Sequence, residues 1–170
     1  MESFRLETIG ELHPVAAQVF VPFAVTRLQE RPEDTEAVLT VVLRGIEQQT
    51  AEERPLRLFW ERSSIPVLPP AIGDAPLTEW AALAVACAVI WHFAGLRLHA
   101  VAAVGDRVDY WVRRDNLDFG LEISGTRRGR PGNSPPGKDA AAAGQPLWRG
   151  RVRGRREFCR STSHLFLASP

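Results

Sequence analysis

The sequence has only two cysteines and lacks a segment that would direct the chain out of the cell. Cys87 and Cys159 lie in very different surroundings, and neither stands at a metal-ligand spacing from a histidine or another cysteine. A disulfide scaffold is therefore disfavoured, and a reducing compartment is favoured. The N-terminus contains no basic region followed by an apolar run, so we expect no signal peptide and a cytoplasmic protein.

Two chemical signatures are also missing. The sequence offers no set of nucleophile, histidine and acid, and no glycine-rich loop for a nucleotide. The longest apolar run extends from Trp80 to Ala94, which is shorter than the about 20 residues that a membrane span requires. We therefore expect no triad hydrolase, no nucleotide-loop enzyme and no membrane partner.

The chain does contain enough apolar residues for one globular domain. Its 170 residues are 45% hydrophobic and include five tryptophans. Charge is unevenly distributed, because residues 1–125 hold 11 Lys and Arg against 18 Asp and Glu, whereas residues 126–170 hold 10 against 2. A basic tail of this kind meets either nucleic acid or the acidic body of the same protein.

The N-terminal portion is predicted to be largely helical. Residues 33–50 begin with acids and continue with apolar residues at helical spacing, which predicts a helix. Residues 14–28 fit either a kinked helix or two extended pieces. Short strands are predicted at 4–9 and 56–60, and a proline-rich connection at 63–76.

The strongest predicted helix covers residues 74–95. Asp74 suits its N-cap, and Gly95 suits the position just past its C-terminus. The only polar side chain in its long apolar run is His92, which we expect to be a core histidine bonded to a carbonyl. This segment therefore predicts a buried central helix, followed by a strand at 96–104.

Residues 105–126 are predicted to form a hairpin with strands at 107–112 and 119–124. The alternation of apolar and polar residues sets Val112 opposite Phe119, Tyr110 opposite Leu121, and Asp109 opposite Glu122. Side chains so opposed lie about 5 Å apart. Two carboxylates there require a cation or a shared proton. Alternatively, each carboxylate lies on a solvated face and pairs with an arginine such as Arg107.

The composition changes after residue 126, which is the predicted end of the globular domain. Residues 127–170 form a basic Gly, Pro, Ala and Arg-rich tail, predicted to be loop or disorder with a short edge strand at 147–158. An out-of-frame translation of GC-rich DNA would have the same composition. The candidate contacts to nucleic-acid phosphates are Arg127, Arg128, Arg149, Arg151, Arg153 and Arg155.

The order of elements from residue 75 to 126 resembles the core of the PD-(D/E)xK nuclease superfamily, the restriction-endonuclease-like fold. The predicted helix carries Glu79, a later strand carries Asp109, and the last strand carries Glu122-Ile123-Ser124. The resemblance implies that Glu79, Asp109 and Glu122 hold Mg²⁺ or Mn²⁺, with the backbone carbonyl of Ile123 as a further ligand. Ser124 stands where the family has lysine, and Arg127 or Lys138 is the candidate replacement.

The resemblance implies a metal-dependent phosphodiesterase acting on nucleic acid, with Asp109, Glu122 and Ser124 as catalytic residues. The metal would activate a water molecule and stabilise charge on the scissile phosphate. The alternatives are a non-catalytic binding or assembly module on the same fold, or a partner-binding protein whose carboxylates form structural salt bridges, either one as a homo-oligomer or with a protein partner. The expected fold is α+β or α/β, with a central buried helix packed on a small mixed sheet and a restriction-endonuclease-like core.

Overall fold

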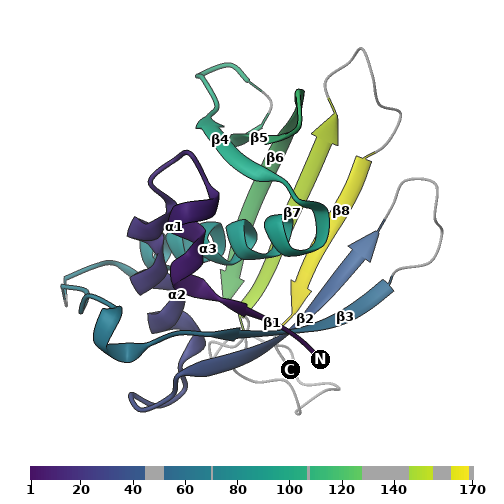
Figure 1. The fold of residues 1–170 in the computed structure, drawn as a ribbon. Helices are drawn as coiled ribbons and strands as arrows, with labels where there is room; N and C mark the ends of the chain where they lie inside the picture. The colour runs from purple at the N-terminus through teal and green to yellow at the C-terminus, as the bar shows by residue number, and fades with distance from the viewer. Residues whose placement is uncertain (45–51, 70, 107, 128–145, 155–161, 169–170) are drawn as a thin grey trace, which may run out of the picture.

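Eight strands form one curved sheet in the computed structural model, which describes residues 1–44, 52–69, 71–106, 108–127, 146–154 and 162–168 (Figure 1). The strand order is β1-β3-β2-β8-β7-β6-β5-β4, and every neighbouring pair is antiparallel except β1 with β3. The strands are β1 (Glu2–Arg5), β2 (Glu36–Arg44), β3 (Glu52–Phe59), β4 (Arg97–Val101), β5 (Tyr110–Arg114), β6 (Leu117–Arg127), β7 (Pro146–Gly154) and β8 (Thr162–Ala168). The fold is α+β, as predicted.

The long helix α3 (Asp74–Ala94) crosses one face of the sheet, with the shorter helices beside it (Figure 1). These are α1 (Ile9–Leu12), α2 (Val21–Leu28) and the 3-10 turns η1 (Leu6–Thr8), η2 (Ala17–Phe20) and η3 (Arg62–Ser64). Residues 81–90 of α3 are buried without interruption, which confirms the predicted central helix. By length and apolar composition α3 could cross a membrane, but 61% of its most apolar window is buried inside this protein.

The ends of α3 follow from local sequence. Gly95 adopts a left-handed conformation with φ of 62°, and its N–H donates to the Trp91 carbonyl at 2.9 Å. Glycine reaches this conformation without a steric penalty, so it ends the helix as predicted. At the other end the N-cap is Gly73 rather than Asp74, which is the first helical residue. The Asp74 carboxylate instead accepts a hydrogen bond from Arg27 at 2.6 Å.

The helix predicted at 33–50 is wrong, because residues 36–44 form strand β2 and residues 45–51 lie outside the described residues. The apolar residues of this segment fit both periods. Leu39 and Val41 point into the core at 0% exposure, as alternate residues of a strand do. The β-branched residues in this segment also favour the extended backbone, and pairing with β3 decides between the two.

The predicted hairpin is confirmed between β5 and β6. Tyr110 pairs with Leu121, Trp111 with Gly120 and Val112 with Phe119, in the predicted register. The turn at Asp115-Asn116 places Asp115 at a φ of 54°, a conformation that short polar residues tolerate. Val112 and Leu121 are fully buried beneath α3 and complete the core.

The sheet continues beyond the predicted domain boundary at residue 126. Strand β7 pairs with β6 on one side and with β8 on the other, and β8 then pairs with β2. The strand predicted at 147–158 is therefore internal rather than at an edge, and it spans 146–154. Residues 128–145 and 155–161, part of the predicted disordered tail, lie outside the described residues.

Candidate functional site

The three predicted metal ligands lie on separate elements. Glu79 is an exposed residue of α3, Asp109 precedes β5, and Glu122 belongs to β6. Within the described part of the chain, no three side chains of His, Cys, Asp or Glu are grouped so that they could hold one metal ion. The described carboxylates therefore do not assemble the ligand set that the resemblance implies, and binding of Mg²⁺ or Mn²⁺ stays a prediction.

The backbone around Asp109 departs from the predicted register. Its N–H donates to the Leu121 carbonyl at 3.0 Å, so Asp109 and Tyr110 both face Leu121, as in a β-bulge. The carboxylate of Asp109 accepts the backbone N–H of Ile123 at 2.8 Å. Asp109 thus ties the start of β5 to β6, instead of standing in direct register opposite Glu122.

Two of the predicted acids act on Tyr110. Burial raises the pKa of the Tyr110 phenol, and the negative charges of Glu79 and then Asp109 raise it further. Glu79 and Asp109 therefore lie within electrostatic range of one half-buried phenol.

The arginine-rich segment lies directly beside strand β6. The Cα positions of Glu122 and Arg151 pair in register, as do those of Ser124 and Arg149. Of the predicted nucleic-acid contacts, Arg127 ends β6, the arginines at 149, 151 and 153 belong to β7, and Arg128 and Arg155 lie outside the described residues. The arginine-rich strand is therefore part of the same sheet as the acidic portion of the chain, and its contact with nucleic acid stays a prediction.

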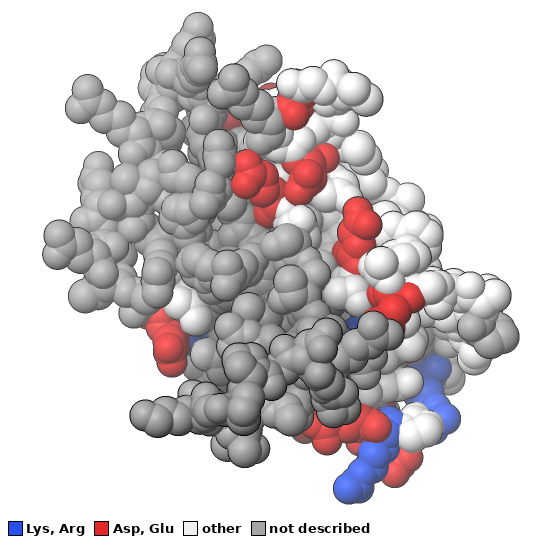
Figure 2. All heavy atoms as spheres, turned by 180° about the vertical axis from the view of Figure 1, so that it is seen from behind, with Lys and Arg blue, Asp and Glu red and all other residues white. Residues whose placement is uncertain are grey.

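The face of the molecule opposite to that in Figure 1 is rich in acids among its described residues. Figure 2 shows acidic side chains at several heights among the described residues of this face, and most of the basic side chains in view near its lower end. These acidic side chains would themselves repel a phosphate, because like charges repel.

A pocket that the sequence did not indicate lies at the C-terminal end of α3. Its volume is about 540 Å³, and the residues that give it its chemistry are Trp91, Arg97, His99, Arg113, Arg114 and Asp115. Strand pairing assembles it, because Arg97 of β4 lies opposite Arg113 of β5. We call this cavity the basic pocket. Only the pairing of β4 with the hairpin, which the structure supplies, brings these residues together.

The three arginines of the basic pocket differ in their partners. Arg113 forms two hydrogen bonds with Asp118, at 2.7 and 3.1 Å, and this hydrogen bonding raises its pKa. Arg114 donates to the Ala94 carbonyl at 3.1 Å. The Arg97 guanidinium lies over the Trp91 ring, 5.0 Å from its centroid, and has no hydrogen bond or ion pair within the described residues. Arg97 is therefore the one available to a ligand.

A buried histidine holds the strand that carries Arg97. His13 is 4% exposed, and its Nδ1 accepts the N–H of Leu98 at 2.7 Å. Burial lowers the pKa of His13 to about 4; the Cys87 carbonyl opposes this shift and the Arg97 charge adds to it. His13 is therefore neutral near pH 7 and fixes β4 against the end of α1.

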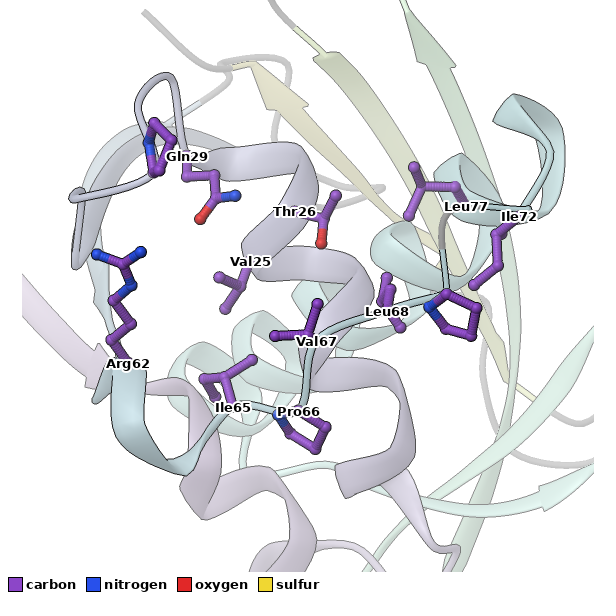
Figure 3. A pocket seen from close by; sticks show the side chains of 12 residues that line it. Val25, Thr26, Gln29, Arg62, Ile65, Pro66, Val67, Leu68, Ile72 and Leu77 are labelled. Atoms are coloured by element: carbon purple, nitrogen blue, oxygen red, sulfur yellow. The ribbon is translucent and has the colours of Figure 1, made fainter.

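A second pocket lies beside α2, under the proline-rich connection (Figure 3). Its volume is about 450 Å³, and most of its wall is apolar, including Val25, Ile65, Val67, Leu68, Ile72 and Leu77. Arg62 and Gln29 lie on the same side of the pocket, away from Leu77 and Ile72 (Figure 3). We call this cavity the proline-lined pocket.

His92 bonds to a carboxylate rather than to the predicted carbonyl. Its Nε2 forms a hydrogen bond with Glu2, which also accepts one from Arg54. Hydrogen bonds from His92 and Arg54 lower the pKa of Glu2. Arg54 lies over the Phe93 ring at 5.3 Å, so the cluster anchors β1 and β3 to α3. Its members satisfy one another, which indicates a structural role.

Comparison of the chain with models of protein families, with curated proteins and with solved structures gives no match.

Proposed function

We propose that this protein binds a small phosphate-bearing ligand in the basic pocket, a function that differs from the expected metal-dependent phosphodiesterase and from the binding or assembly module expected on the same fold. The observation that carries the proposal is the convergence of Arg97, Arg113 and Arg114 on one cavity, with Arg97 unpaired among the described residues. A guanidinium presents several N–H donors in a planar fork that matches phosphate oxygens.

Each neighbour of Arg97 has a definite part in this recognition. The Trp91 ring supports the flat guanidinium from below, which limits its motion before a ligand arrives. His99 adds a second nitrogen donor in the same cavity. Arg114 donates to the Ala94 carbonyl and keeps its positive charge for the cavity, whereas the charge of Arg113 is offset by Asp118 and its part is to hold the wall.

The lining of this cavity favours binding over reaction. Its one carboxylate, Asp115, lies in the hairpin turn, and no serine, threonine or cysteine lines the wall. A nucleophile with an adjacent base is therefore missing from the residues that line the pocket. Recognition without chemistry is the function that this set of side chains supports best.

Titration calorimetry with inorganic pyrophosphate tests the proposal. We expect one molecule bound per chain, and an affinity at least tenfold weaker in Arg97→Gln. Arg31→Gln is the matched control, because this substitution also removes one arginine charge. Arg31 is exposed and lines neither pocket. Equal weakening in both variants would instead indicate a diffuse electrostatic attraction and would reject the pocket as the site.

A metal-dependent nuclease is the second candidate, favoured by the joint action of Glu79 and Asp109 on Tyr110. Millimolar Mn²⁺ should then raise the melting temperature of the wild type and not that of Asp109→Asn, and should support cleavage of a mixed DNA and RNA substrate. A melting temperature that Mn²⁺ leaves unchanged would argue against this candidate.

A further inference from the structure

The proline-lined pocket has a mostly apolar set of lining residues. Nine of its twelve lining residues are apolar, and three of these are prolines, Pro32, Pro66 and Pro69. Proline has no backbone N–H, so these three residues add hydrocarbon to the wall without adding a backbone donor. Val67 is 96% exposed at the rim, although valine is usually buried. The wall therefore offers apolar surface that the fold itself does not cover.

The polar groups of the pocket are few and concentrated. The Thr26 hydroxyl already donates to the Pro22 carbonyl at 2.8 Å. The side chains of Arg62 and Gln29 have no hydrogen bond or ion pair within the described residues, and they lie on the same side of the cavity (Figure 3). A guanidinium and a primary amide together supply several N–H donors to one acceptor group.

We infer that the proline-lined pocket binds a small amphipathic monocarboxylate, with its carboxylate on Arg62 and Gln29 and its hydrocarbon body along Val25, Ile65 and Leu68. The guanidinium pairs with a carboxylate through two parallel hydrogen bonds. The apolar wall supplies the remaining affinity by excluding water from the hydrocarbon. A volume of about 450 Å³ lies in the usual range for small-molecule sites.

One cation in an apolar cavity also limits the class of ligand. A polyphosphate or dicarboxylate would leave at least one charge without a partner against the hydrocarbon wall, which is costly. The inference is independent of the proposed function, because the two cavities share no lining residue.

The first part of the test compares the binding of octanoate and octanol to the isotope-labelled full chain, measured by NMR. Octanoate should bind with one-to-one stoichiometry and shift the signals of residues 62–68 and 25–29. Octanol carries the same hydrocarbon without the charge and should bind at least tenfold more weakly. Equal binding of the two would reduce the pocket to unspecific apolar adsorption and overturn the inference.

Three variants complete the test. Arg62→Gln should weaken octanoate binding at least tenfold without changing the weak binding of octanol, whereas Arg31→Gln, exposed and next to Pro32, should match the wild type. Val67→Asp changes a residue that is 96% exposed, so it should fold and repel octanoate. Octanoate binding that survives both Arg62→Gln and Val67→Asp would contradict the inference.

The same carboxylate chemistry occurs at the C-terminus of a peptide. A tripeptide Ala-Leu-Leu with a free carboxylate should compete poorly with octanoate, because its polar backbone would lie against the proline wall. Tight binding of this peptide, lost on amidation of its carboxylate, would overturn the assignment in favour of a peptide-docking groove.

Discussion

The two ends of helix α3 show how this fold uses arginine in two different ways. At the C-terminal end Arg114 donates to the Ala94 carbonyl, which complements the partial negative charge of the helix terminus. At the N-terminal end the guanidinium of Arg27 joins α2 to Asp74 and Thr78. Two other arginines form no such hydrogen bond among the described residues, Arg97 in the basic pocket and Arg62 in the proline-lined pocket.

This difference separates structural arginines from those free to bind ligands. Arg27, Arg113 and Arg114 donate hydrogen bonds to Asp74, Asp118 and the Ala94 carbonyl, and these bonds join elements of the fold. Arg62 and Arg97 face cavities of about 450 and 540 Å³ and have no ion pair among the described residues. The comparison implies that substitution of the first group lowers stability, whereas substitution of the second lowers affinity.

The largest expected effect is the loss of folding stability in acid through His13, whose Nδ1 accepts the N–H of Leu98. The unfolded chain binds a proton on histidine near pH 6.5, whereas folded His13 does so only near pH 4, so stability is complete above about pH 6.5 and is lost as the pH falls toward 4. The loss is roughly 3 kcal/mol. Urea unfolding at pH 7 and pH 4.5 measures it, and His13→Gln should flatten that difference. An unchanged pH dependence in His13→Gln would show that other groups cause it.

The next effect compares Arg27, which is bonded to the N-terminal end of α3, with Arg62 of the proline-lined pocket. Arg27→Gln removes charged hydrogen bonds from a guanidinium whose side chain is 11% exposed, and should lower the free energy of unfolding by roughly 1.5–3 kcal/mol. Arg62→Gln should change it by less than about 0.5 kcal/mol. Chemical denaturation of both variants gives these values. Similar losses would remove the distinction between the two kinds of arginine.

The smallest effect concerns the hairpin that carries Arg113 and Arg114. A Cβ on Gly120 would lie 2.4 Å from the Val108 Cγ1 atom, so Gly120→Ala should cost roughly 1–3 kcal/mol through overpacking. In a Val108→Ala background the same change should cost clearly less, because the clash is removed. A double-mutant cycle measures the coupling, and equal costs in both backgrounds would refute the packing account.

The parts of the fold that sequence predicted rest on strong local signals. Helix α3 has a long apolar run and ends at Gly95, and the hairpin has alternation on both sides of a polar turn. Strand β2 was mistaken for a helix because its apolar residues fit both periods, and only pairing with β3 and β8 decides between them. The internal place of β7 depends on pairing with β6 and β8, which composition does not encode.

The candidate sites were harder to predict for a related reason. Asp109 does not pair with Glu122, because the strand is irregular at Asp109. Its N–H donates to the carbonyl of Leu121, the residue that already pairs with Tyr110. The basic pocket collects side chains from α3, β4 and β5, and the proline-lined pocket joins α2 to a loop more than 30 residues away. The lining residues of each pocket are scattered along the chain, so no spacing of residues in the sequence predicts either pocket.

The most direct test of the central claim is a crystal structure of the protein grown with inorganic pyrophosphate. We expect pyrophosphate in the basic pocket, with its oxygens within hydrogen-bonding distance of the Arg97 guanidinium and with the Trp91 ring still packed on that guanidinium. Pyrophosphate bound instead along the arginines of β7, with the basic pocket empty, would contradict the proposed binding site.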